Sequence, residues 1–400
     1  MQRMQIILAG AFADRGYATD LVVCNGDGDL KDLVPANVRL VVLEKSSNLM
    51  ARWTAARADP AALGILGPSI VLPRKISKSL PSLRGLAKYL STTRPDALFS
   101  GTPHLNIEAV LARRLAGVKT RVVISERTHT TSDNGGAKAW RTRNLASAVG
   151  HVYRQADAIV AVSNGVAEDL AQFASLDRSR IITVHNPALT PDTAARAAEP
   201  VDHPWFADDG VVTILTVGRI GRQKDHTTLV RAFAKLRAER EARLVIIGEA
   251  RDPTKRDQNR DRLLALAAEL GVAQDIMLLG YQANPLRFMA RASLFVLSSR
   301  FEGFGNVLIE ALACGCPVVS TDCPSGPSEI LDGGRFGRLT PVGDPDALAA
   351  AMAATLDNPP LKADLQARAD EFSYNTAIER YVDILLGDPV GPLDPGTAGR

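Results

Sequence analysis

Short apolar runs alternate with amphipathic segments along almost the whole chain, and this alternation restricts its fold more than any other feature. Runs rich in Val, Ile and Leu have the length of strands at residues 18–24, 38–43, 97–99, 121–125, 158–162, 181–184, 211–217, 244–247, 276–279, 294–297 and 318–321. Between them, apolar residues recur at helical spacing, as at 105–115, 229–236 and 262–270. Strands that are apolar on both faces and alternate with helices are typical of parallel sheets covered on both sides. The sequence therefore predicts an α/β fold with doubly wound sheets.

A proline-rich interruption divides this pattern into two halves. Residues 187–210 show no apolar period, and four prolines fall in this stretch: Pro187, Pro191, Pro200 and Pro204. A chain of 400 residues has room for two or three domains. We therefore expect a Rossmann-like domain at 1–187, a linker at 188–210 and a second domain at 211–373, facing each other across a cleft. Residues 387–400 contain seven Gly or Pro, which predicts a disordered tail.

Charge, hydropathy and cysteine content exclude several classes of protein. The 47 Lys and Arg residues nearly balance the 44 Asp and Glu residues, and a net charge of +3 excludes nucleic-acid binding through bulk charge. No apolar run approaches the roughly 18–20 residues of a membrane-spanning helix, and the first residues lack a signal-peptide pattern. The cysteines are too few for a disulfide framework. We expect a cytoplasmic protein whose cysteines are small, reduced and buried: Cys24, Cys314, Cys316 and Cys323.

The segment at 298–315 carries the most chemistry. A predicted strand ends at Ser299, Gly303 and Gly305 permit close backbone approach, and a helix is expected from about residue 306 to 314. The start of a helix presents free N–H groups and a positive dipole end, which suits a phosphate. Glu302 stands before that helix and Glu310 lies one turn inside it. Two carboxylates that can bind hydroxyl groups thus bracket a predicted phosphate site; a capped helix with solvated glutamates is the alternative.

A second constellation directly follows the predicted strand at 211–217. Gly218 and Gly221 form a turn, and Arg219 and Lys224 can both point toward a ligand. Two fixed cations stabilise a diphosphate leaving group without a metal ion. By itself this loop also fits a solvated turn, and it becomes specific only beside the Glu302/Glu310 segment.

Together these motifs resemble the family 4 retaining glycosyltransferases, which have the GT-B fold and use nucleotide-sugar donors. The resemblance extends from residue 1 to about 386 and keeps the family's motif order. The matching segments are 156–166, 185–187, 218–224, 246–249, Glu302-x7-Glu310, 317–321 and 326–330. A final helix at 374–386 resembles the family's closing segment, which crosses back to complete the first domain.

The resemblance implies a role for each motif residue. Gly218, Arg219 and Lys224 would hold the donor diphosphate. Glu302 would accept hydrogen bonds from the donor sugar, Glu310 would bind the ribose, and backbone amides would contact sugar and phosphates at Gly303, Phe304, Gly305, Asn306 and Val307. The nucleobase would lie near 280–281 and 299–300. The implied reaction is retaining transfer of a hexose or N-acetylhexosamine from a nucleotide-diphosphate sugar, with UDP expected, to a glycan or lipid-linked acceptor in cell-surface polysaccharide synthesis. No metal and no cofactor beyond this co-substrate is implied.

One segment departs from the family pattern. Many members carry a His after the strand equivalent to 121–125, whereas this chain has Glu126 and Arg127 there. Glu126 is therefore a candidate catalytic residue, and so is His129, although a surface-loop histidine is the equal alternative. His104 is a weaker candidate, because it also fits the start of a helix.

Three further sequence features carry weaker predictions. Asp27 and Asp29 resemble a metal-binding pair but fit a turn better. Residues 45–95 contain nine Lys or Arg and a single acid, Asp59, so helices there could lie peripherally against the inner face of an anionic membrane or could form a solvated basic face. The first residues have helical spacing up to Gly16, and the strand that precedes this helix in the family is not present. We therefore expect the first sheet to lack its first strand.

Two other functions remain open beside transfer. A nucleotide-sugar epimerase, hydrolase or phosphorylase on the same fold would need further acid–base carboxylates or a cofactor lysine, and neither pattern is recognisable. A non-catalytic binding relative is opposed by the four donor-site residues: Arg219, Lys224, Glu302 and Glu310.

Overall fold

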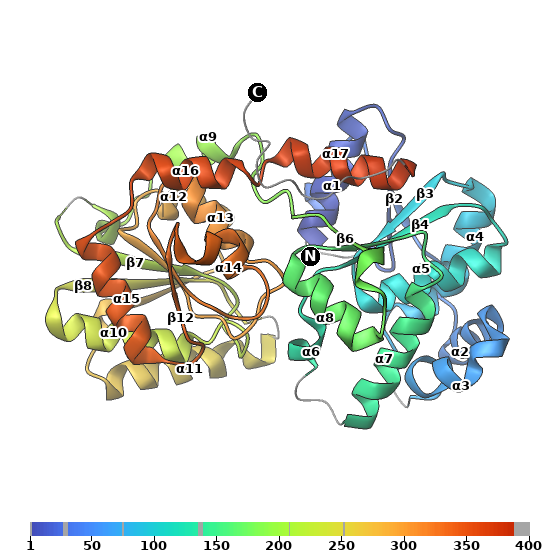
Figure 1. Ribbon diagram of the computed structural model, residues 1–400, viewed down its shortest axis with the longest axis horizontal. Helices are drawn as coiled ribbons and strands as arrows, with labels where there is room; N and C mark the ends of the chain where they lie inside the picture. Colours follow the sequence, from blue (N-terminus) through green and yellow to red (C-terminus); the bar gives the residue numbers. More distant parts are fainter. Residues whose placement is uncertain are drawn as a thin grey trace. The chain divides into compact units, whose positions relative to one another are not determined.

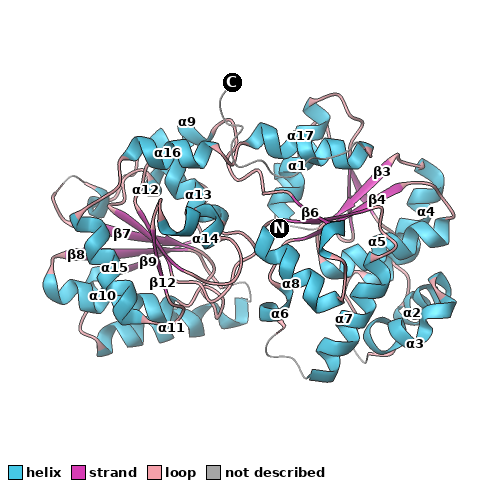
Figure 2. Cartoon of the chain, in the orientation of Figure 1, coloured by secondary structure: helices cyan, strands magenta, loops and turns pink. Residues whose placement is uncertain are grey.

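The structure is a computed structural model that describes residues 2–26, 31–73, 76–134, 139–207, 209–250 and 253–387. It divides into two compact units (Figure 1). Unit 1 takes the chain up to His185 and resumes at Asn375, and unit 2 takes Asn186–Tyr374. Both units consist of helices packed on parallel sheets (Figure 2). No helix in these described ranges is long and apolar enough to cross a membrane.

Unit 2 is built on one sheet of six parallel strands. Their order across the sheet is β12-β11-β10-β7-β8-β9. The bounds are β7 Val212–Val217, β8 Ala242–Ile247, β9 Ile276–Gly280, β10 Leu294–Leu297, β11 Val318–Thr321 and β12 Arg338–Thr340. The chain moves outward from β7 in one direction and then from β10 in the other. The boundary between β7 and β10 is therefore the topological switch point, where ligands of such sheets bind.

Helices cover both faces of this sheet, as the doubly wound prediction requires. In Figure 1, α10, α11 and α15 lie below the sheet and α12, α13 and α16 lie above it. A continuous apolar core joins the lower helices to the strands through residues such as Phe233, Leu244 and Met352. The bounds are α9 Thr193–Ala198, α10 His226–Glu239, α11 Pro253–Glu269, α12 Leu286–Met289, α13 Asn306–Ala313, α14 Pro327–Ile330, α15 Pro345–Asp357 and α16 Lys362–Asp370.

Unit 1 contains two separate parallel sheets. One has the order β3-β4-β5-β6, and the other is the pair β1-β2. No strand among the described residues pairs with both sheets. The bounds are β1 Asp20–Val23, β2 Arg39–Val42, β3 Ala97–Ser100, β4 Arg121–Glu126, β5 Ala158–Ala161 and β6 Ile181–Thr183.

The helices of unit 1 come from both ends of the chain. The last helix, α17, packs on strands β3 and β4. The ring centres of Tyr381 and of Phe99 in β3 lie 5.4 Å apart, and Nε of Arg121 in β4 donates to the Ile384 carbonyl at 2.8 Å. The bounds are α1 Gln2–Asp14, α2 Asn48–Ala58, α3 Leu63–Leu66, α4 Leu83–Thr93, α5 Pro103–Ala116, α6 Thr130–Asp133, α7 Ala139–Tyr153, α8 Asn164–Ala174 and α17 Tyr374–Leu386.

Two features of the structure were not expected from the sequence. The expected linker at 188–210 contains α9, whose Arg196 is joined to the Ala283 carbonyl at 3.2 Å, so this stretch is an integral part of unit 2. β12 was not expected, because its residues Arg-Leu-Thr lack an apolar run. The predicted tail lies almost wholly outside the described residues, which end at 387.

Candidate active site

Two motif loops meet in unit 2 because their strands are neighbours. Strand β7 leads into the loop that carries Arg219 and Lys224, and strand β10 leads into the loop that carries Glu302. The two strands pair in parallel, with Leu294 opposite Ile214. Their carboxyl ends therefore lie at the same edge of the sheet, at its switch point.

Lys224 and Glu302 form an ion pair at this edge. Lys224 Nζ lies 2.7 Å from Glu302 Oε1, and the same oxygen accepts a hydrogen bond from Ser299 Oγ at 2.6 Å. The two charged side chains are only 15% and 8% exposed, so water screens their attraction weakly. The pair fixes a carboxylate and an ammonium group side by side where a ligand would bind.

Backbone contacts hold the two loops together around this pair. Ser298 Oγ donates to the Lys224 carbonyl at 2.8 Å, the Arg300 amide donates to the Gln223 carbonyl at 2.8 Å, and Gln223 Nε2 donates to the Phe301 carbonyl at 3.1 Å. A Cβ on Gly218 would lie 2.8 Å from Lys224 Cε, so a larger residue at this position would displace the lysine side chain. The lysine therefore crosses directly over the glycine of the turn.

The second cation of the motif has a different environment. Arg219 is exposed, and it makes no hydrogen bond or ion pair within the part of the chain that the structure describes. A third cation, Arg300, is bound instead to Asp225, with 3.0 Å between Nε and Oδ2. A ligand can therefore recruit Arg219 without breaking an internal contact, and the same holds for Arg222, the other exposed arginine of this loop.

The helix after Glu302 begins as the sequence predicts. Gly305 caps α13 with a φ of 97°, and Asn306 is its first residue. The loop before it is held by the loop after β11, because the Glu302 amide donates to the Pro324 carbonyl at 3.1 Å. A Cβ on Gly326 would lie 1.7 Å from the Phe304 carbonyl oxygen, so only glycine permits this approach. Glu310 lies half-buried one turn inside α13.

Burial keeps two further side chains beside the ion pair uncharged. Burial lowers the pKa of His226 to about 3, helped by the neighbouring charge of Lys224, so its imidazole is neutral near pH 7. Burial also raises the pKa of the Cys323 thiol to about 12, with a contribution from Glu302. The Lys224–Glu302 pair thus has two neutral side chains beside it, and the Asp225–Arg300 ion pair adjoins it along the chain. In the described ranges, no group of three His, Cys, Asp or Glu is placed to hold a metal ion.

Glu126 lies at the carboxyl end of β4 in unit 1 and is 1% exposed. Its Oε2 accepts a hydrogen bond from Tyr153 at 3.1 Å, and its Oε1 accepts one from the Arg127 amide at 3.3 Å. Asn106 Nδ2 supports the Tyr153 hydroxyl at 2.9 Å. Burial raises the pKa of Glu126 to about 7, against the opposing effect of the Tyr153 hydrogen bond.

His129 has local partners in unit 1. Its Nδ1 accepts a hydrogen bond from the Ser132 amide at 3.3 Å, which caps α6, and lies 3.4 Å from Asp169 Oδ1. His104 is the second residue of α5, as the alternative interpretation of this position proposed. The structure thus gives His129 a capping contact of its own, and its catalytic assignment stays a prediction.

Sequence analysis missed some contacts of the unit 2 site. The side chains of Ser299 and Arg300 contact Glu302 and Asp225, and the nucleobase position near them stays a prediction. The contact of Gln223 with the Phe301 carbonyl was not predicted from the sequence. The position of Gln223 between Arg219 and Lys224 could have indicated that it lies in the site. Three of the cysteines are buried as expected, and Cys24 is partly buried. Asp27 and Asp29 lie outside the described residues.

Comparison with known proteins identifies the same two halves. The model of the family "Glycosyl transferases group 1" matches residues 201–372, and that of "Glycosyl transferase 4-like domain" matches residues 7–187. A relative from Campylobacter jejuni, N-acetylgalactosamine-N,N'-diacetylbacillosaminyl-diphospho-undecaprenol 4-alpha-N-acetylgalactosaminyltransferase, is 34% identical over 63% of this chain and 65% of its own length. The lipopolysaccharide core biosynthesis glycosyltransferase LpsE of Rhizobium meliloti is 30% identical over 59% of this chain and 66% of its own length. The chain therefore aligns with somewhat less than two thirds of these relatives.

A solved structure extends the similarity in fold to nearly the full chain. The crystal structure of Anabaena HepE in complex with UDP and glucose matches with a TM-score of 0.72 and 20% sequence identity, over 96% of this chain and 95% of that one. The two family models together match residues 7–187 and 201–372, which is most of the chain. The chain therefore belongs to the family 4 glycosyltransferases, and its fold is GT-B.

Proposed function

We propose that the protein transfers a hexose or N-acetylhexosamine from a nucleotide-diphosphate sugar to an acceptor, with retention of anomeric configuration and without a metal ion. The observation that carries the proposal is the 2.7 Å pair of Lys224 and Glu302 at the switch point of the unit 2 sheet. A diphosphate leaving group needs positive charge, and a sugar needs hydrogen-bond acceptors for its hydroxyl groups. Lys224 supplies the positive charge, and Glu302 beside it supplies the hydrogen-bond acceptor.

Each motif residue takes one part of the donor in this proposal. Lys224 and the exposed Arg219 stabilise the departing diphosphate, so that no divalent ion is required. Glu302, already oriented by Lys224 and Ser299, accepts hydrogen bonds from the sugar. The backbone amides of residues 303–307 face sugar and phosphates at the start of α13, and Glu310 binds the ribose.

UDP is the proposed nucleotide and a lipid-linked glycan the proposed acceptor. The similar Anabaena protein was crystallised with UDP and glucose, and the Campylobacter relative is named for a diphospho-undecaprenol substrate. These names support, for this chain, a UDP-linked donor and a lipid-linked glycan acceptor. Retention is supported by the resemblance to family 4.

The test is nucleotide release from a panel of UDP-, GDP- and ADP-sugars in the presence of excess EDTA, with lipid-linked acceptors and water-soluble analogues. Acceptor-dependent UDP release and an α-linked product by NMR are the expected results. Consumption of donor without any acceptor product would indicate hydrolysis or epimerisation instead. Strict dependence on Mg²⁺ or Mn²⁺ would contradict the metal-independent clamp.

A further inference from the structure

The residue that follows Lys224 has an unusual backbone conformation. Asp225 has a φ of 45° and a ψ of 48°, in the left-handed region that few residues other than glycine adopt. It stands at the N-cap of α10, yet its side chain makes no capping hydrogen bond to that helix. Neither a local backbone preference nor helix capping therefore explains why an aspartate is held at this position.

The carboxylate of Asp225 binds the loop that follows β10. Its Oδ2 lies 3.0 Å from Arg300 Nε and accepts a hydrogen bond from Thr228 Oγ1 at 2.9 Å. The Asp225 side chain is only 6% exposed, so water screens its attraction to the guanidinium weakly. The Asp225–Arg300 ion pair therefore joins the end of the loop after β7 to the loop after β10.

Arg300 binds the two neighbours of Lys224 in the chain. Its backbone amide donates to the Gln223 carbonyl at 2.8 Å, and its guanidinium binds Asp225. Ser298 Oγ donates to the carbonyl of Lys224 itself at 2.8 Å. Three consecutive residues are thus each bound by the loop after β10. The backbone from which the Lys224 side chain departs is therefore fixed relative to the loop that carries its ion-pair partner.

The next residue along the chain also has an unfavourable environment. His226 is 3% exposed, and neither of its ring nitrogens has a hydrogen-bond partner within the part of the chain that the structure describes. A buried polar group without a partner costs stability. Two successive residues with unfavourable features thus follow Lys224 directly. Such features concentrate at functional sites, where the surrounding structure imposes them.

We propose that the Asp225–Arg300 ion pair positions Lys224 against Glu302, where its ammonium group meets the departing diphosphate. Asp225 and Arg300 are positioning residues, since they act through Lys224. This inference rests on the proposed function and adds two residues to it. A lysine side chain is long and flexible, and a displacement of about 1 Å in a reacting group can cost about 10²-fold in rate. Fixing the backbone on both sides of Lys224 limits such a displacement.

The first test is steady-state kinetics of Asp225→Gly, Arg300→Ala and the double variant, measured as UDP release with the donor and acceptor that the panel of sugars identifies. Glycine adopts a φ of 45° without cost and is accepted at an N-cap, so Asp225→Gly removes the ion pair without straining the backbone. We expect kcat to fall about 10- to 100-fold in each single variant, with the donor KM nearly unchanged. The double variant should be no worse than either single variant, because both changes remove the same pair.

A conservative variant and the pattern of losses decide the outcome. Asp225→Asn keeps a residue that tolerates the left-handed backbone and offers Arg300 a neutral acceptor, so its kcat should lie between those of the wild type and Asp225→Gly. A raised donor KM in Arg300→Ala that Asp225→Gly does not share would mean that Arg300 contacts the donor itself, and it would overturn the proposal. Losses that multiply in the double variant, or a wild-type kcat in Asp225→Gly, would overturn it as well.

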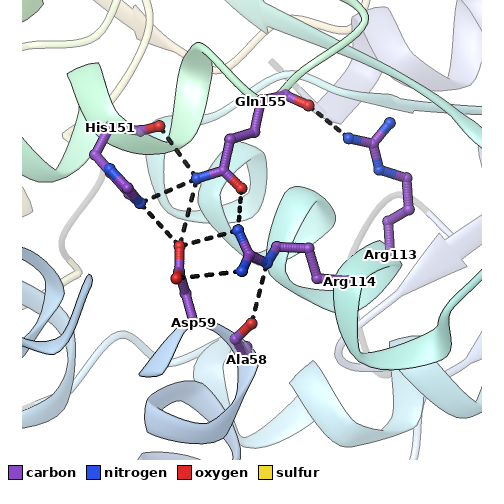
Figure 3. A network of polar contacts seen from close by, with 6 residues as sticks. All are labelled: Ala58, Asp59, Arg113, Arg114, His151 and Gln155. Atoms are coloured by element: carbon purple, nitrogen blue, oxygen red, sulfur yellow. Dashed lines mark hydrogen bonds and ion pairs between the residues drawn. The ribbon is translucent and has the colours of Figure 1, made fainter. Parts of the chain in front are cut away.

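A matched control is present in unit 1, where another buried aspartate is bound by an arginine (Figure 3). Asp59 is 2% exposed, and its carboxylate lies 3.1 Å from Arg114 Nη1 and 2.8 Å from His151 Nε2. These contacts join the end of α2 to α5 and α7. Arg114→Ala should lower the melting temperature, because a buried carboxylate loses a charged partner, and it should leave kcat unchanged. A loss of kcat as large as that of Arg300→Ala would show that any broken buried ion pair slows turnover, and it would overturn the positioning role.

The second test measures the position of Lys224 directly and needs no sugar transfer. Crystal structures of the wild type and of Asp225→Gly are compared at the distance between Lys224 Nζ and Glu302 Oε1, which is 2.7 Å in this structure. We expect this distance to lengthen beyond hydrogen-bonding range in the variant, and an unchanged distance would overturn the proposal. A wild type that transfers no sugar would contradict the proposed function, whereas a displaced lysine in Asp225→Gly would still support the positioning role of the ion pair.

Discussion

Two buried carboxyl groups stand at the carboxyl ends of parallel strands in this chain, one in each unit, and their surroundings differ. Glu302 in unit 2 has an ammonium group at 2.7 Å and a serine hydroxyl at 2.6 Å. Glu126 in unit 1 has a tyrosine hydroxyl at 3.1 Å and a backbone amide at 3.3 Å, and burial raises its pKa to about 7. The first carboxyl group has a full opposite charge beside it, and the second accepts hydrogen bonds from two neutral donors.

The two carboxyl groups therefore suit different chemical roles. A carboxylate already paired with a cation can bind hydroxyl groups while its partner binds phosphate, so ligand charge and ligand hydroxyls are recognised together. A carboxyl group that burial drives toward its protonated form can hold a hydrogen-bond network without bringing a charge. We therefore expect Glu302 to act on the substrate directly, and Glu126 to position the backbone at the Glu126–Arg127 junction.

Removal of the charged pair should give the largest effect. Glu302→Ala takes away the sugar acceptor and leaves Lys224, only 15% exposed, without its carboxylate. We expect turnover to fall by about 10³-fold and the free energy of unfolding to fall by about 3 kcal/mol, since one half of a buried pair remains. Steady-state kinetics and chemical denaturation measure the two quantities.

A double variant separates the two causes. Lys224→Met/Glu302→Leu removes both charges and should regain most of the lost stability while remaining inactive. If the double variant recovered activity along with stability, the pair would be structural and the proposed role of Glu302 would be wrong.

The exposed cation should give the next largest effect. Arg219→Ala is expected to lower kcat/KM by about 10²-fold, because the leaving diphosphate loses one of its two charge partners. Its melting temperature should not change, since Arg219 has no partner among the described residues. Arg222→Ala is the matched control, as an exposed arginine of the same loop outside the proposed clamp, and it should keep wild-type kinetics. Equal losses in both variants would indicate a general charge effect of the loop.

Glu310 should affect binding more than turnover. Glu310→Ala is expected to raise the donor KM by about 10-fold or more, corresponding to roughly 1–3 kcal/mol of lost charge-assisted hydrogen bonds, with kcat nearly unchanged. A 2′-deoxyribose donor sharpens the test, because wild type and variant should bind it almost equally. A variant that lost kcat for both donors would place Glu310 at the reacting sugar instead.

The sequence predicted the strands and the charged motifs because both depend on local pattern. β10 and β11 have the predicted bounds; four consecutive apolar residues define β10, and β11 consists of two valines, a serine and a threonine. The contact between Lys224 and Glu302 could not be read from spacing, as it requires β7 and β10 to be neighbours across 78 residues of chain. Because both motifs follow parallel strands, the sequence predicted only that they lie at the same edge of the sheet.

The features that the sequence did not predict depend on tertiary contacts. β12 pairs at the edge of the sheet through backbone hydrogen bonds with β11, which its polar residues do not announce. Within the proline-rich stretch, α9 forms because it packs on α12 and Arg196 reaches Ala283. The burial of Asp59 depends on Arg114 and His151, which lie far along the chain, so it could not be predicted from the local sequence.

Glu126 should give the smallest effect on activity, and its signature is a dependence on pH. Its pKa rises from an ordinary value of 4.5 in the unfolded chain to about 7 in the folded protein. The folded state therefore holds a proton that the unfolded state loses, so this group's contribution is complete below pH 4.5 and declines until pH 7. Glu126→Gln keeps the shape and remains neutral, and it should match the wild type near pH 4 and become more stable by about 3 kcal/mol near pH 8. Glu108 is also buried with a pKa of about 7, so the difference between variant and wild type is the quantity to measure, by denaturation at several pH values. Glu44→Gln, an exposed control, should show no such trend.

We expect the transfer activity of Glu126→Gln to lie within a few-fold of the wild type at pH 7. A loss of activity comparable to that of Glu302→Ala, together with a stability difference that does not change with pH, would make Glu126 a catalytic residue.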